Sequence, residues 1–260
     1  MVLLPVSTIV TGMVLAAMPV GDYDKRLVIL TKEIGKISVF AKGARRPNSA
    51  LLACSQPFTF GEFTLYTGRS SYNIMSAEIS NYFGELREDF NSLCHGFYFC
   101  EFADYLTKEN NDERNILKLL FQTLRAVSKK TINITLIRLI YELKIMALNG
   151  EMPQVFGCVK CNQQFMESNQ EGNISSDRFY FSPISGGILC KGCRGNDPKA
   201  VLINTSTLYT MQYIISKDIE KLYTFKVSEE VLNELKKCVG NYLECYVEHE
   251  FKSMEMISDI

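Results

Sequence analysis

The first part of the chain alternates short apolar runs with turn residues, a pattern typical of β-strands. Lys32–Gly35 and Thr67–Ser70 have the composition of hairpin connections. The pattern predicts five strands: Thr8–Met18, Leu27–Thr31, Ile34–Ala41, Phe58–Tyr66 and Tyr72–Glu78. Five short strands in so few residues predict a small barrel, and the OB-fold is the version of such barrels that commonly binds nucleic acid.

Helical spacing replaces the strand pattern after residue 80. Apolar residues at helical steps predict one helix with a single buried stripe from Leu86 to Thr107, built from Leu86, Phe90, Leu93, Phe97, Cys100 and Leu106. Two more helices are predicted at Ile116–Val127 and Ile132–Leu148, the second ended by Asn149-Gly150. Helices are also predicted at Asn204–Ser216 and Ser228–Phe251.

Two cysteine pairs stand between these helical regions, Cys158-Val-Lys-Cys161 and Cys190-Lys-Gly-Cys193, with 28 residues between them. Each pair places two thiolates on one side of a tight turn, and together they supply the four sulfurs of a closed structural Zn²⁺ site. The separation predicts an inserted hairpin or loop, and the nearby glycines Gly157, Gly192 and Gly195 are expected to supply positive φ values.

The alternatives to zinc are two redox dithiols, or two disulfides in a secreted protein. The other five of the nine cysteines lie in apolar stretches, where a free thiol packs as a small hydrophobe, and this favours a reducing cytosol. Because a closed Cys₄ site has no open position for water or substrate, zinc here predicts a scaffold rather than metal catalysis.

These patterns define an α+β fold of three parts. We expect an N-terminal five-stranded OB-fold barrel over residues 1–80, an α-helical domain over residues 81–154 and 196–260, and a Cys₄ zinc-binding insertion over residues 155–195. The uncharged opening, Met1 to Gly21, lacks the basic start of a signal peptide and is predicted to be a strand. No uninterrupted apolar run is long enough to predict a transmembrane helix.

Positive charge is concentrated in the predicted barrel. Gly21 to Arg46 holds seven basic and three acidic residues, a local charge of +4 in a chain whose net charge is −1. Such asymmetry indicates a surface for phosphates, although strand lysines can also serve only to solvate a surface. The candidate DNA contacts are Lys25, Arg26, Lys36, Lys42, Arg45, Arg46 and Arg69.

Aromatic residues are interleaved with these charges. Exposed rings could stack bases, as in many proteins that bind single strands. We expect Phe40, Phe58 and Phe63 in the barrel core, whereas Tyr23 and Tyr72 are more open candidates.

No catalytic constellation is recognisable in the chain. The two histidines, His95 and His249, lie inside helical patterns, where a core or surface role is expected. No P-loop and no dinucleotide-binding glycine motif is found. The sequence therefore predicts that the protein is not an enzyme.

A series of short motifs occurs in a characteristic order from about Val10 to Cys193: Gly21–Lys25, Thr31–Ile37, Ala41–Pro47, Gln56–Phe58, Gly61–Phe63, Leu65-Tyr66, Leu86–Asp89, Tyr141–Leu143 through Gly150 to Pro153, Phe181–Pro183 and Gly186–Cys190. In order and spacing they resemble the RecO family of bacterial recombination mediators and DNA repair proteins. The resemblance implies an OB-fold domain, a helical domain and a zinc-binding domain.

The resemblance also implies a non-enzymatic function. Members of this family bind single- and double-stranded DNA, anneal complementary strands, and help load recombinase onto strands coated by single-strand-binding protein. The implied partners are RecR and the C-terminal tail of single-strand-binding protein, and the implied location is the bacterial cytoplasm, at the nucleoid.

Two further hypotheses concern a docking site for the tail of single-strand-binding protein and an alternative class of function. An acidic, apolar-tipped tail needs apolar walls with a cation at the mouth, and the third predicted helix offers Arg138, Tyr141 and Lys144. The alternative function is that of a zinc-ribbon adaptor of transcription or translation that acts through protein–protein contacts.

Overall fold

The computed structural model describes residues 7–68, 71–165, 178–195 and 197–258. The chain divides into two compact units, Met1–Lys130 with Glu250–Ile260, and Thr131–His249. Among the described residues, no helix combines the length and apolar character needed to cross a membrane.

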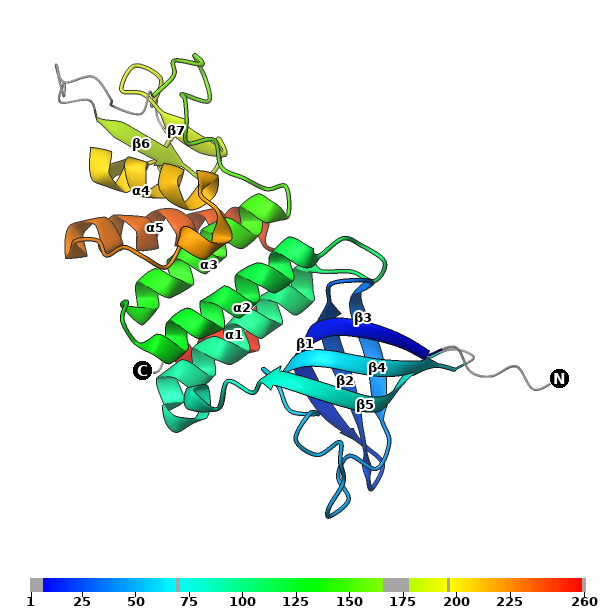
Figure 1. Ribbon diagram of the computed structural model, residues 1–260. Coiled ribbons are helices and arrows are strands. Elements are labelled where there is room, and N and C mark those ends of the chain that lie inside the picture. The colour runs from blue at the N-terminus through cyan, green and yellow to red at the C-terminus, as the bar shows by residue number, and fades with distance from the viewer. Residues whose placement is uncertain (1–6, 69–70, 166–177, 196, 259–260) are drawn as a thin grey trace. The chain divides into compact units, whose positions relative to one another are not determined.

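The first unit begins with a closed barrel of five strands in the order β1-β2-β3-β5-β4 (Figure 1). The strands are β1 (Ser7–Val20), β2 (Asp24–Thr31), β3 (Gly35–Ala41), β4 (Phe60–Thr67) and β5 (Tyr72–Asn81). One face of each strand fills the interior with residues such as Leu27, Val39 and Phe63. The barrel confirms the predicted OB-fold, with five strands close to the predicted positions.

Where the barrel closes, β3 and β5 pair over a short length only. Their parallel register joins Val39 to Tyr72 and Phe40 to Asn73. The first half of β3 is instead bridged by the loop that follows the first helix, through Gly35 and Glu109. At this seam the barrel wall is therefore formed by three segments: β3, β5 and the loop after the first helix.

The helix predicted from Leu86 to Thr107 is two elements, a 3₁₀ turn η1 (Gly84–Glu88) and the helix α1 (Phe90–Leu106). The prediction of one continuous helix was wrong because Asp89 between them is extended and its carboxylate accepts a hydrogen bond from the Ser92 N–H at 3.0 Å, as a helix N-cap. The single buried stripe was also wrong, since Phe90 is 61% exposed.

The helix α1 is buried on more than one side because several elements pack against it. The ring centroid of Phe97 lies 4.9 Å from that of Phe58, which precedes β4. The second helix, α2 (Arg114–Lys129), is confirmed, and Phe121 on it lies 4.6 Å from Phe60.

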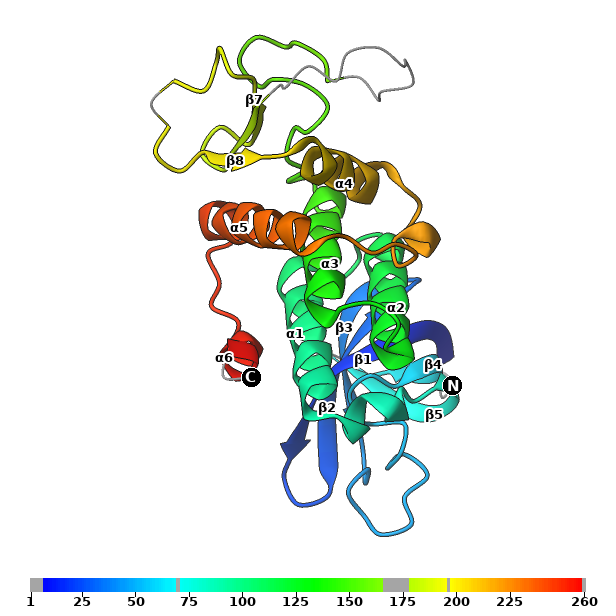
Figure 2. The same ribbon diagram turned by 90° about the vertical axis from the view of Figure 1, so that its left-hand side faces the viewer.

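The end of the chain returns to α1. The helix predicted over Ser228–Phe251 ends at Tyr246, and a short helix α6 (Lys252–Ser258) follows an extended segment. Phe251 lies among the rings of Tyr98 and Phe102, at centroid distances of 5.4 and 4.6 Å. Figure 2 shows α6 beside α1. The predicted helix was too long because it included Phe251, whose apolar side chain packs against α1.

The second unit combines three helices with a small antiparallel sheet, in the order β7-β6-β8. Its elements are α3 (Ile134–Leu148), β6 (Phe179–Ser182), β7 (Gly187–Leu189), β8 (Val201–Ile203), α4 (Thr205–Ser216), η2 (Ile219–Lys221) and α5 (Glu229–Tyr246). The hairpin of β6 and β7 confirms the insertion predicted between the cysteine pairs. The strand β8 was not predicted, since three residues are too few to show an alternating pattern.

Candidate nucleic-acid interface and metal centre

Three of the predicted cations gather on the loop that follows β3. Lys42, Arg45 and Arg46 are all exposed. The loop is fixed to the β1–β2 turn by two hydrogen bonds: the Gly43 N–H donates to Asp24 Oδ1 at 2.7 Å, and the Arg45 N–H donates to the Tyr23 carbonyl at 2.8 Å. These bonds hold the positive charges together at one end of the barrel. We call the surface formed by Lys42, Arg45, Arg46 and Tyr23 the basic apex.

An exposed aromatic ring belongs to the basic apex. Tyr23 is 51% exposed, and the guanidinium carbon of Arg46 lies 5.2 Å from the centroid of its ring. The apex therefore offers cations for phosphates and one ring face of the kind on which bases stack.

Lys25 lies beneath the basic apex and has a partner within the protein. Its ammonium donates to the Ser55 carbonyl at 3.0 Å, which ties β2 to the loop before β4. Burial and then repulsion from Arg45 lower the pKa of Lys25. Lys25 thus adds positive potential to the apex from a half-buried position.

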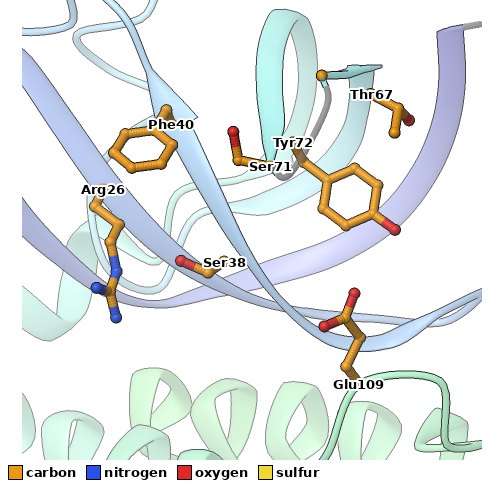
Figure 3. A pocket seen from close by; sticks show the side chains of 8 residues that line it. Arg26, Ser38, Phe40, Thr67, Ser71, Tyr72 and Glu109 are labelled. Carbon is orange, nitrogen blue, oxygen red and sulfur yellow. The ribbon is translucent and has the colours of Figure 1, made fainter.

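A groove of about 420 Å³ opens on the barrel wall at the seam between β3 and β5. Arg26 on β2 lies directly across from Phe40 on β3, so both side chains share one face of the sheet. The groove is lined by Arg26, Ser38, Phe40, Thr67, Gly68, Ser71, Tyr72 and Glu109 (Figure 3). In OB-folds this face of the second and third strands, with the loop between the last two, is the usual place for an oligonucleotide.

The other predicted contacts are placed differently. The ammonium of Lys36 lies 2.8 Å from Asp104 Oδ1 on α1, so this cation is paired away from the apex. Arg69 lies outside the described residues. Phe58 and Phe63 are fully buried as expected, but Phe40 is only partly buried and lines the groove, which corrects its expected core role.

The two histidines have the core and surface positions expected for them. His95 is buried in α1, where its Nδ1 lies 2.9 Å from the Asn91 carbonyl oxygen. His249 is exposed.

The docking surface predicted on α3 is contradicted by burial. Tyr141 is 0% exposed and Lys144 is 6% exposed. The ammonium of Lys144 donates to the carbonyls of Ile215 and Lys217, at 2.7 and 2.8 Å. The side chain of Arg138 is only 13% exposed and lies 3.8 Å from Glu142. Lys144 is interior because α4 packs against α3, and the three described side chains are too buried to form an open groove for a peptide tail.

The four predicted cysteines converge in the second unit. The sulfurs of Cys158, Cys161, Cys190 and Cys193 all lie within 4.8 Å of one another, and those of Cys161 and Cys190 are 3.8 Å apart. A hydrogen bond from the Val159 N–H to the Ile188 carbonyl, at 2.9 Å, ties the first turn to β7. The sequence therefore identified the residues, and the β6–β7 hairpin brings the two turns together.

The turns use positive φ values at only some of the expected positions. Gly195 has a φ of +57°, but Gly157 and Gly192 are not in that region, and Asn162 adopts it after the first pair. Asparagine tolerates this conformation better than most residues because its short side chain bonds locally.

Electrostatics within the cluster fit a bound cation. Burial alone would raise the pKa of Cys158, but hydrogen bonds from the backbone N–H groups of Cys190, Cys161 and Lys160 lower it to about 6. Next to it, the sulfurs of Cys190 and Cys161 raise the pKa of Cys193 to about 12. Four thiols this close cannot all ionise without a compensating charge, and a divalent ion supplies that charge. The cluster could therefore hold a metal ion.

Several residues of the groove were not predicted as contacts. Ser38, Thr67 and Ser71 are small polar residues with no charge or motif to single them out. Glu109 lies in sequence about 70 residues after β3, and only the bridge to Gly35 brings it to the barrel wall. No signal in the sequence could have found it.

Comparison with known families covers most of the chain. The family model described as Recombination protein O N terminal matches residues 7–83, and the model described as Recombination protein O C terminal matches residues 87–255.

Curated relatives align with this chain over nearly their whole length. The chain is 35% identical to the DNA repair protein RecO of Alkaliphilus metalliredigens, over 96% of this chain and 98% of the relative. It is 30% identical to the DNA repair protein RecO of Acetivibrio thermocellus, over 96% of both chains. For the protein of the same name from Bacillus pumilus, the identity is 27% over 96% of this chain and 93% of the relative.

Proposed function

Because the chain belongs to the RecO family and so acts in DNA repair and recombination, we propose that it is a mediator that binds DNA through the basic apex and the groove of its barrel. It anneals complementary strands and helps load recombinase onto single-stranded DNA coated by single-strand-binding protein. The family match gives no support to the alternative of a zinc-ribbon adaptor of transcription or translation.

One observation carries the DNA-binding proposal. Exposed cations at the apex and a groove with partly buried aromatic rings occur on the same small barrel, while the chain as a whole is slightly acidic. Lys42, Arg45 and Arg46 would neutralise phosphates, and Phe40 and Tyr72 would contact bases. Such a combination is typical of proteins that hold single strands with little sequence preference.

Annealing needs no bond chemistry, so we propose a non-enzymatic protein. Two complementary strands repel each other through their phosphates, and a protein that neutralises part of that charge lets base pairs form. The proposed partners are single- and double-stranded DNA, RecR and the tail of single-strand-binding protein. Binding to DNA would hold the protein at the nucleoid in the cytoplasm.

The metal that we propose for the cysteine cluster is a structural Zn²⁺, held by Cys158, Cys161, Cys190 and Cys193. Zinc takes four thiolates in closed sites and contributes folding free energy there. It would stabilise the segment over residues 155–195, which we propose as a zinc-binding part distinct from the barrel (residues 1–80) and the helical part (residues 81–154 and 196–260).

The salt dependence of DNA binding tests the proposal. Replacing Arg45 and Arg46 with Glu should weaken binding to unrelated oligonucleotides alike and slow annealing. It should also lower the slope of log affinity against log salt by about 0.7 for each phosphate of a single strand that the variant no longer neutralises. Fluorescence anisotropy over a salt series measures the slope.

A matched control makes the same change of charge elsewhere. Lys236 and Lys237 are exposed on α5, and their replacement with Glu should leave the salt slope unchanged. Equal affinity and slope for wild type and the Arg45/Arg46 variant at low salt would refute DNA binding by the basic apex.

A further inference from the structure

The groove on the barrel wall carries opposite charges on its two sides. Figure 3 shows the guanidinium of Arg26 and the carboxylate of Glu109 on opposite sides, with Ser38 between them and the ring of Tyr72 near Glu109. Both charged residues are exposed. Because a carboxylate repels a phosphate at short range, the Glu109 side of the groove disfavours the phosphate backbone.

The position of Glu109 is fixed by the backbone on both sides of it. The Lys36 N–H donates to the Lys108 carbonyl, and the Asn110 N–H donates to the Ile34 carbonyl, both at 3.0 Å. Gly35 allows this approach: its φ is +69°, and a Cβ there would lie 2.3 Å from the Lys108 carbonyl oxygen. Glu109 is thus presented to the groove from a loop that is bonded to β3 like an extra strand.

The chemistry of the groove gives each side a different part of a nucleotide. The Arg26 guanidinium suits a phosphate oxygen. The rings of Phe40 and Tyr72 suit the flat face of a base. An ionised carboxylate can only accept hydrogen bonds, so Glu109 suits a base whose exposed edge donates. Cytosine presents an exocyclic amine, whereas thymine presents a carbonyl oxygen at the same position.

We propose that Glu109 is a specificity-determining residue, which accepts a hydrogen bond from the cytosine amine of a base held in the groove and disfavours thymine. The groove then has a base preference, although the apex binds any sequence. This inference rests on the proposed function, because it assumes that single-stranded DNA occupies the groove.

The test compares two oligonucleotides that differ only in their bases. Fluorescence anisotropy is measured with labelled oligo-dC and oligo-dT of about twelve nucleotides, within the site size of an OB-fold. Wild type should bind oligo-dC about fivefold more tightly, the lower end of the discrimination expected for one base-edge contact. Glu109→Gln should reduce the ratio to about one, because a carboxamide offers both an acceptor and a donor.

The control is Glu78→Gln, which makes the same change of charge at an exposed position of β5 outside the lining of the groove. It should preserve the preference for oligo-dC. A second variant, Glu109→Ala, should also lose the preference, which separates removal of the acceptor from any new interaction of the glutamine.

The outcomes separate this inference from the proposed function. If wild type binds both oligonucleotides equally, or if Glu109→Gln keeps the wild-type ratio, Glu109 is not a base contact. In either case the salt slope of the Arg45/Arg46 variant still decides whether the barrel binds DNA. If replacing Arg45, Arg46 and Arg26 leaves binding to both oligonucleotides unchanged, the proposed DNA binding by the barrel is refuted, and the inference about Glu109 is refuted with it.

Discussion

Replacing Lys144 with Met should loosen the C-terminal end of α4 without opening a cavity. Lys144 is 6% exposed, and its ammonium donates to the carbonyls of Ile215 and Lys217, the last carbonyls around the end of that helix. Helix C-terminal carbonyls lack partners within the helix and carry partial negative charge. Methionine keeps most of the aliphatic volume but leaves these carbonyls without the cation.

The magnitude follows from two opposing contributions. Two hydrogen bonds from a charged donor contribute about 3–6 kcal/mol. Part of this is offset because the buried ammonium loses its hydration, an effect visible in the direction of its pKa, which burial lowers and Asp218 raises. We expect a net loss of about 2 kcal/mol in the local stability of α4.

Hydrogen exchange is the appropriate assay, because the chain has two compact units and a single unfolding free energy is not defined for it. A loss of about 2 kcal/mol makes the amides of α4 exchange about 30-fold faster. The control Lys217→Met removes the same charge from an exposed side chain whose ammonium lies 5.6 Å from the Tyr213 ring centroid. Equal exchange rates in α4 for the two variants would show that Lys144 does not stabilise this end of the helix.

Three other changes have expected outcomes. Cys161→Ser should lower the zinc content, measured by elemental analysis, from about one ion per chain. The control Cys245→Ser, at an exposed cysteine outside the cluster, should leave the zinc content unchanged. Freshly reduced wild type that holds no zinc would refute the proposed zinc site. Asp89→Ala should cost about 1 kcal/mol at neutral pH through loss of the α1 N-cap. Since hydrogen bonds from the Ser92 side chain and backbone lower the pKa of Asp89 below its ordinary 3.8, this stabilisation is present above that value and is lost as pH falls through the lowered pKa. Hydrogen exchange of the α1 amides at neutral and strongly acidic pH should therefore show the variant and wild type converging in acid, and a difference that persists there would contradict the assignment. Gly35→Ala should destabilise the first unit by about 1–3 kcal/mol and displace the loop that carries Glu109, and protection of the Lys36 amide from exchange equal to that of wild type would argue against it.

The sequence by itself determined the features that depend on local order along the chain. Alternation of apolar residues with turns placed the five strands, because successive side chains in a strand point to opposite faces and one face must be buried. The spacing within Cys158–Cys161 and Cys190–Cys193 identified the metal-binding candidates, because a ligand pair on a tight turn is a local structure. The charge of the loop after β3 was equally visible, since a loop leaves its side chains at the surface.

Only the tertiary structure decided which side chains are exposed and which distant residues meet. Lys144 looked like a surface cation on α3, but α4 packs over it and its ammonium bonds to two carbonyls there. Phe40 looked like a core residue, yet the seam between β3 and β5 leaves it in the groove. Glu109 and Phe251 reach their contacts from remote parts of the chain. The periodicity of apolar residues indicates that one face of a segment is buried. It does not identify the element that covers that face, because the covering element is determined by packing among segments far apart in sequence.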